Sequence, residues 1–264
     1  MAIIERLRHA EVEGIRVGRF RGRISTTCIV YRFAEVVIDT GPPNQWRWVK
    51  RFIQEHQPRQ VLITHHHEDH GGNGARLQKE LSLPLLAHRE GVPLLQNGFK
   101  VHLYRKIIWG TPPSYVAEAV DQEIHLSGGE TLLPVLAPGH SRDMTCFLLK
   151  QRGWLFSGDL YIASRPKFLR RDENPKQEIE SLKKVLQLDF DVLFCAHRGI
   201  VKNGKQALQD KLDFLLELHA RIAQLYAQGK SLGEITRELL GREEVLSWLT
   251  FFHFSKRNLI RGLL

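Results

Sequence analysis

The chain has 264 residues, of which 42% are hydrophobic and 25% are charged. This composition is ordinary for a globular protein and excludes extensive disorder, so we expect one large domain, or one domain with an appendage. No stretch approaches the roughly 18 apolar residues of a membrane span, and the charged N-terminus lacks an apolar signal segment. These absences and an odd number of well-separated cysteines predict a cytoplasmic protein that does not enter a membrane. The formal charge of +9 favours anionic partners, including nucleic acid and acidic small molecules.

Strands and helices are predicted to alternate along most of the chain. Runs rich in β-branched residues and bounded by turn residues indicate strands, and apolar residues at helical spacing indicate helices. The predicted strands cover 26–33, 35–41, 60–65, 84–88, 123–127, 131–140, 145–150, 154–159 and 191–197. The predicted helices cover 46–56, 71–81, a stretch ending near 109, and 175–188. This alternation is typical of an α/β layer architecture.

The character of the sequence changes after Gly204. No further strand is predicted there, and long runs have helical spacing, so we expect a domain over 1–204 and an all-helical C-terminal region over 205–264. The sequence SLGE at 231–234 places Ser before Glu at the spacing of a helix capping box.

The sequence HHHEDHGG at 65–72 follows a predicted buried strand. Alternate side chains of an extended segment project to the same side, so His65 and His67 could bind one metal ion while Asp69 and His70 face a second. The alternative is a polar loop in which Asp69 caps the next helix. That alternative does not explain why three later predicted strands end in residues of the same types, which are His140, Asp159 and His197.

The motifs THHHEDHGG, PGHS, SGDLY and AHRG occur in this order and resemble the signature of the metallo-β-lactamase superfamily over roughly residues 15–200. The resemblance implies a four-layer αββα sandwich that binds two divalent metal ions. It implies that one ion is bound by His65, His67 and His140, that the other is bound by Asp69, His70 and His197, and that Asp159 bridges both. Imidazole and carboxylate ligands suit zinc, with manganese and iron as alternatives.

A bridging aspartate at position 159 makes the site more similar to the glyoxalase II-like, lactonase-like and nuclease members of the superfamily than to true β-lactamases. We therefore expect a hydrolase of a carbonyl ester, thioester or lactone that acts through a metal-bound hydroxide, with Asp69 orienting the hydroxide or the returning proton. Three alternatives stay open. They are a phosphodiesterase acting on RNA or DNA, a mononuclear iron persulfide dioxygenase, and, outside the enzymes, a metal-stabilised nucleic-acid-binding module.

A basic run follows Asp159 directly. Because Asp159 is expected at the metals, this loop should lie near the mouth of the site, where it could bind an anionic group of a small-molecule substrate. A solvated basic surface loop is the alternative. The residues concerned are Arg165, Lys167, Arg170 and Arg171.

Overall fold

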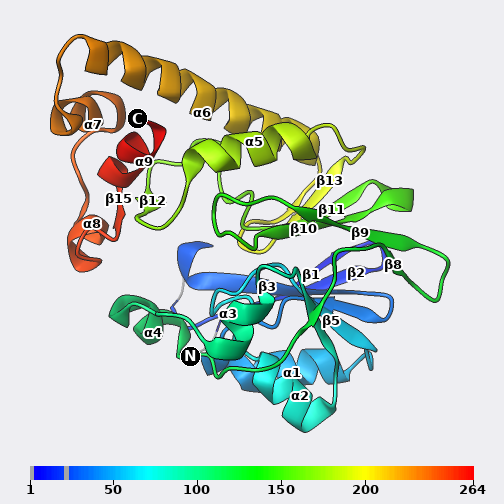
Figure 1. Cartoon of the computed structure of the whole chain (residues 1–264). Coiled ribbons are helices and arrows are strands. Elements are labelled where there is room, and N and C mark those ends of the chain that lie inside the picture. Colours follow the sequence, from blue (N-terminus) through cyan, green and yellow to red (C-terminus); the bar gives the residue numbers. More distant parts are fainter. Residues whose placement is uncertain (1–2, 21–23) are drawn as a thin grey trace.

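The computed structural model describes residues 3–20 and 24–264, and in it two β-sheets pack face to face. Helices α1 and α2 cover the outer face of the first sheet, and α5 and α6 cover the outer face of the second (Figure 1). The four-layer αββα sandwich that the sequence predicts is therefore confirmed.

The first sheet has seven strands in the order β1 to β7, antiparallel as far as β4 and parallel beyond it. The second has six strands in the order β14-β13-β11-β10-β9-β8, and β12 pairs with β15 in a separate ribbon. The strands of the first sheet are β1 (Ile3–His9), β2 (Val12–Gly18), β3 (Thr27–Phe33), β4 (Val36–Ile38), β5 (Gln60–Ile63), β6 (Leu85–Ala87) and β7 (Glu118–Ala119). The others are β8 (Ile124–His125), β9 (Thr131–Leu136), β10 (Thr145–Leu149), β11 (Trp154–Gly158), β12 (Leu169–Arg170), β13 (Val192–Cys195), β14 (Gly199–Val201) and β15 (Phe254–Ser255).

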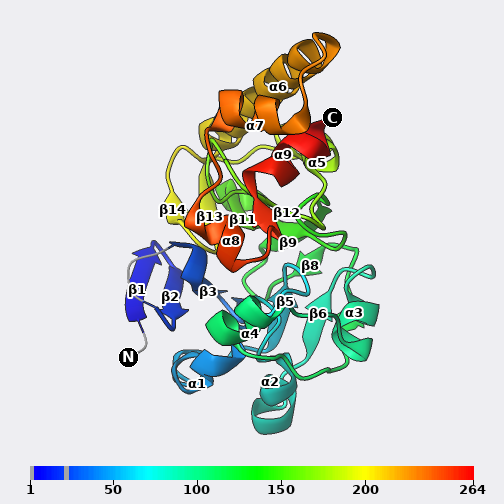
Figure 2. The same cartoon turned by 90° about the vertical axis from the view of Figure 1, so that its left-hand side faces the viewer.

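The helices lie outside the two sheets. They are α1 (Trp46–Gln54), α2 (Gly74–Leu81), α3 (Val92–Asn97), α4 (Leu103–Trp109), α5 (Pro175–Val185), α6 (Gly204–Ala227), α7 (Leu232–Leu240), α8 (Val245–Leu249) and α9 (Lys256–Leu263). Figure 2 shows α8 next to α4, on the side of the molecule where the β12–β15 ribbon lies. Within the described part of the chain, no helix is both long and apolar enough to cross a bilayer.

Strand β3 shows how the sequence builds the layers. Ile29, Tyr31 and Phe33 belong to the core between the two sheets, whereas Val30 belongs to the core beneath α1. Since alternate side chains of a strand face opposite sides of its sheet, a strand buried on both faces is mostly apolar, and the buried Arg32 of β3 is paired with Glu13. Each sheet thus contributes to the central core and carries a second core under its own helices.

Every predicted strand and helix is present, although several end earlier than expected. The C-terminal region is helical as predicted apart from the short strand β15, and Ser231 and Glu234 form the predicted capping box at the start of α7. The β1–β2 hairpin escaped prediction because charged residues interrupt its apolar pattern. Arg16 in this hairpin is held by Glu5 and by the carbonyl oxygen of His197, a pairing that local sequence does not encode.

Candidate metal centre

All the predicted ligand-type residues meet at one edge of the sandwich, and all are buried. They come from loops at the ends of four strands: the loop after β5 in the first sheet, and the loops after β9, β11 and β13 in the second. The site therefore joins the two sheets. The residues are His65, His67, Asp69, His70, His140, Asp159 and His197.

Three histidines form one half of the centre. Nε2 of His65 lies 2.8 Å from Nδ1 of His67, and Nε2 of His140 lies 3.0 Å from the same Nδ1. One ligand-type atom of each residue lies within 4.8 Å of those of the others. The three nitrogens therefore converge on one position.

Asp69, His70 and His197 form the other half, again with one ligand-type atom each within 4.8 Å. Oδ2 of Asp69 lies 3.8 Å from Nε2 of His70 and 3.6 Å from Nε2 of His197. This group contains a carboxylate, whereas the first group consists of imidazoles alone.

Asp159 lies between the two groups. Its Oδ2 is 3.2 Å from Nε2 of His140, and its Oδ1 is 3.3 Å from Nε2 of His70 and 3.1 Å from Nε2 of His197. One carboxylate thus faces both halves with different oxygens.

A glycine places Asp159 in this position. Gly158 has φ of +49°, and a Cβ built on it would lie 2.4 Å from the Met144 side chain and 3.0 Å from that of Thr64. Only glycine adopts this conformation without strain, and the register of β11 against β13 shifts at the same point. The strand therefore turns at Gly158 and delivers the next side chain into the gap between the sheets.

The buried acceptors in the centre fit divalent cations. Among the described residues, none donates a hydrogen bond of good geometry to either carboxylate oxygen of Asp69 or Asp159, and Nε2 of His70 is also unpaired. Leaving buried carboxylate oxygens unpaired is costly unless a cation compensates them. Nitrogen and oxygen donors without a thiolate suit zinc, manganese or iron.

The electrostatics agree with this donor set. Burial lowers the pKa of His65 and of His67 well below the usual value, which keeps both imidazoles neutral, as metal ligation requires. Burial alone would lower the pKa of His70, but the carboxylates of Asp159, Asp39 and Asp69 raise it well above its usual value. The second half of the centre therefore carries excess negative charge that favours a cation.

Outer partners orient the ring nitrogens that face away from the centre. Nδ1 of His70 lies 2.7 Å from Oδ2 of Asp39, and Nδ1 of His197 lies 2.6 Å from the carbonyl oxygen of Thr27. Nδ1 of His140 lies 3.3 Å from Oε1 of Glu173. These contacts direct the three Nε2 atoms inward, a role that such partners play around metal sites in general.

Asp39 is the functional residue that sequence reasoning missed. It was assigned to the end of a predicted strand, but its carboxylate accepts hydrogen bonds from the backbone N–H of Thr64 at 2.8 Å and from its hydroxyl at 2.9 Å. Its φ of +65° is uncommon outside glycine, asparagine and aspartate. The available signal was the polar sequence Asp-Thr-Gly at the end of an apolar strand, beside the strand that carries the histidines.

We expect Asp39→Asn to lower the metal affinity of the protein by about 10- to 100-fold. Asparagine tolerates the positive φ, so the loop is kept, but the negative charge that supports the His70 imidazole is lost. Competition with a chromogenic chelator measures the affinity, with Asp213→Asn on the exposed face of α6 as the matched control. Equal affinities for the two variants would contradict an orienting role for Asp39.

The remaining side chains of the histidine loop face other partners. Nδ1 of His66 lies 2.8 Å from Oδ1 of Asp143, and the Glu68 carboxylate is fully buried in an ion pair with Arg105 of α4. Neither His66 nor Glu68 belongs to the two ligand-type groups.

The structure places the four residues of the predicted basic run in different surroundings. Nη1 of Arg170 lies 3.2 Å from both Nδ1 of His67 and Nε2 of His140, and Lys167 lines the cavity at the centre. Arg171 lines a second cavity, and Arg165 is exposed and lines neither. Two of the four basic residues, Lys167 and Arg170, therefore line the cavity at the centre.

The cavity at the centre has a volume of 220 Å³. Its lining includes Asp69, Asp159 and His197 from the centre, the charged side chains of Lys167 and Glu173, and apolar side chains such as Phe168. It can hold a polar reacting group next to an apolar or anionic portion of the same molecule.

The sequence matches the profile of the metallo-beta-lactamase superfamily over residues 22–197. The chain belongs to this superfamily. Its most similar solved structures include a beta-lactamase domain protein from Burkholderia ambifaria, with a TM-score of 0.73 and 18% identity over 98% of this chain and 87% of that one. At this identity the likeness supports the fold alone.

Curated relatives of this superfamily member include an atrochrysone carboxyl ACP thioesterase from Aspergillus fumigatus, 28% identical over 78% of this chain and 61% of the relative. A thioesterase from Emericella nidulans is 33% identical over 47% of this chain and 32% of the relative. The chain thus spans 61% or less of the length of these two relatives.

Proposed function

We propose that this protein is a two-metal hydrolase of small-molecule carbonyl esters, with thioesters as the favoured class and lactones as related substrates. The position of Asp159 carries the proposal. Its carboxylate faces both groups of ligand-type atoms with different oxygens, and neither oxygen has a hydrogen-bonding partner of good geometry among the described residues. A buried carboxylate that lies between the two groups of ligand-type side chains, without a hydrogen bond of good geometry, is suited to bind two cations.

The ligand assignment follows the two groups of side chains. When bound, divalent ions lower the pKa of water and polarise a carbonyl oxygen. The residues that would hold one ion are His65, His67 and His140; those that would hold the other are Asp69, His70 and His197, with Asp159 shared by both.

Asp69 would also move a proton. Both of its oxygens are buried and free of hydrogen bonds of good geometry from the described residues, and it lines the cavity that a substrate would enter. A carboxylate in this position can accept the proton lost by the attacking water and return it to the departing thiol or alcohol.

Two basic side chains would position the substrate. Arg170 and Lys167 both line the cavity, and Arg170 is also held by Glu173 at 3.5 Å. Cations here would bind an anionic group of the substrate. The preference for a thioester is supported by the relatives that are named thioesterases.

Elemental analysis and substrate assays of one sample test the proposal. Protein purified without added metal is analysed for bound ions and assayed against a thioester, a lactone and an activated phosphodiester. We expect about two zinc or manganese ions per chain and turnover of the thioester or lactone. About one iron per chain, or turnover of the phosphodiester alone, would overturn it.

A further inference from the structure

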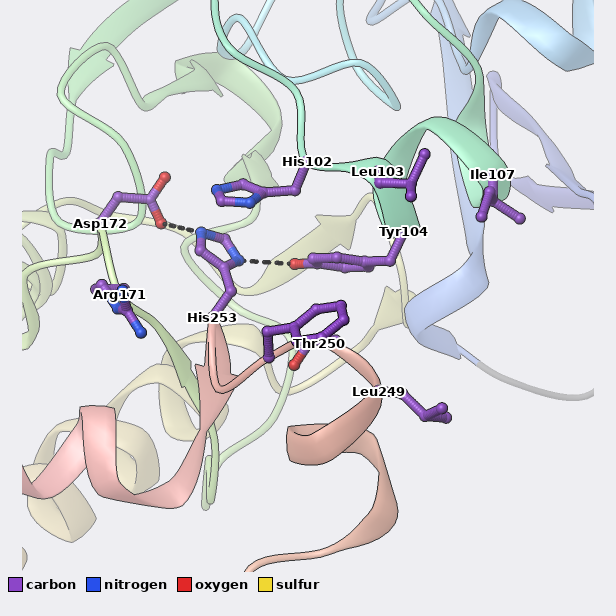
Figure 3. Close-up of a pocket in the computed structure, with 10 residues that line it drawn as sticks. His102, Leu103, Tyr104, Ile107, Arg171, Asp172, Leu249, Thr250 and His253 are labelled. Carbon is purple, nitrogen blue, oxygen red and sulfur yellow. Dashed lines mark hydrogen bonds and ion pairs between the residues drawn. The ribbon is translucent and has the colours of Figure 1, made fainter.

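A second and larger cavity, of 530 Å³, lies between α4 and the segment 249–253 that follows α8. Figure 3 shows His102 and Tyr104 on one side of it and His253 and Thr250 on the other. One wall of the cavity, formed by residues of α4, belongs to the half of the sandwich that contains the first sheet. The opposite wall, formed by residues 249–253, belongs to the C-terminal region. None of the ligand-type residues of the metal centre lines this cavity.

The β12–β15 ribbon brings this cavity next to the metal centre. Arg170 pairs with Phe254 in the ribbon, and both line the metal-site cavity. The backbone N–H of Arg171 donates to the carbonyl oxygen of His253 at 2.8 Å, and both of these residues line the second cavity. Adjacent positions of one ribbon thus belong to two different cavities, which places the two cavities side by side.

The outer walls of the second cavity are unusually apolar for exposed surface. Leu103 is 73% exposed, Leu249 67% and Phe251 86%. Solvent-exposed apolar side chains that converge on a cavity favour an apolar ligand.

The backbone at Phe251 is an independent sign of function. Phe251 has φ of +50° and Phe252 has φ of +57°, a conformation that bulky residues rarely adopt. Strain of this kind persists where the surrounding structure imposes it, and it is concentrated at sites that bind ligands. Here it holds the Phe251 ring in solvent at the cavity instead of in a core.

The polar groups at the floor of the cavity already have partners. Nε2 of His253 lies 3.3 Å from Oδ1 of Asp172, and Nδ1 of His253 lies 2.9 Å from the Tyr104 hydroxyl (Figure 3). The His102 ring contacts the His253 ring at a tilt of 35°, with centroids 3.7 Å apart. An occupant therefore does not need to supply hydrogen bonds to them. The cavity offers apolar contact above a polar floor that is internally paired.

We infer that this cavity binds the apolar acyl group of the substrate whose carbonyl carbon reacts at the metal centre. The inference rests on the proposed function and narrows the substrate class to thioesters and esters with a long-chain or aromatic acyl group. Leu103, Leu249 and Phe251 are the residues that determine this specificity.

Two thioesters of N-acetylcysteamine that differ only in the acyl group test the inference. We expect kcat/KM for the decanoyl thioester to exceed that for the acetyl thioester by about tenfold or more. Phe251→Asn, which tolerates the positive φ, and the double variant Leu103→Ser/Leu249→Ser should each reduce this ratio about tenfold, mainly through KM. Leu216→Ala, which removes an exposed apolar side chain on α6 far from the cavity, should leave the ratio unchanged.

A binding measurement separates this inference from the proposed hydrolase activity. Calorimetric titration with the unreactive S-decyl thioether of N-acetylcysteamine needs no turnover, and weaker binding by Phe251→Asn than by Leu216→Ala would support the cavity even if no thioester is cleaved. Decanoyl turnover with an unchanged ratio in both cavity variants would overturn the inference and leave the hydrolase proposal standing. No detectable binding of the thioether by the unsubstituted protein would also overturn it.

Discussion

Asp69→Asn is expected to lower kcat for thioester hydrolysis by about 10²- to 10⁴-fold. Asparagine keeps the size of the side chain and one oxygen, but it cannot accept a proton at the position that faces the cavity. KM should change much less than kcat, because the lost interaction belongs to the transition state and not to substrate binding. Steady-state kinetics with the preferred thioester measure both constants.

Two controls show whether a loss of activity in Asp69→Asn comes from the missing proton acceptor. Elemental analysis of the variant shows whether ions are retained, since Asp69 would also bind one of them. Asp210→Asn makes the same chemical change on the exposed face of α6, where the carboxylate accepts a hydrogen bond from Gln206 at 2.8 Å. Activity of Asp69→Asn equal to that of Asp210→Asn would rule out the proton-transfer role.

Arg105→Met is expected to destabilise the metal-free protein by about 3–5 kcal/mol. Glu68 is fully buried and Arg105 is 4% exposed, and the two side chains form an ion pair. Burial raises the pKa of Glu68, while the Arg105 charge acts in the opposite direction. Methionine fills a similar volume but leaves the carboxylate without a cation, and a buried unpaired charge is strongly destabilising.

Urea unfolding of chelator-treated protein measures this change without a contribution from bound metal. The double variant Arg105→Met/Glu68→Leu provides the comparison, because replacing both members of a buried pair with apolar residues is often neutral. We expect it to recover most of the lost stability. A double variant as unstable as Arg105→Met would show that Arg105 acts by packing and not by neutralising Glu68.

The positions of the strands along the chain and the candidate ligand residues could be predicted because both have local signals. Each strand that precedes a candidate ligand is an apolar run that ends in a loop, and a polar residue at the end of a buried strand is conspicuous. His140, Asp159 and His197 each stand out for this reason.

The outer partners and the second cavity could not be predicted, because they depend on contacts between distant segments. Asp39 reaches His70 only because β4 lies next to β5 in the sheet. The second cavity forms where Leu103 and Tyr104 meet residues 249–253, and neither segment has a motif of its own.

The topology has a consequence for how the protein folds. All neighbours in the first sheet are consecutive along the chain, and those in the second are nearly so, which means that each sheet can assemble from its own stretch of sequence. The ligand-type residues come from both sheets, so their full arrangement arises only when the two preformed halves dock. An ion that binds the docked form alone would stabilise that form by mass action, and the fraction of chains with docked sheets would then depend on the free metal concentration in the folding mixture.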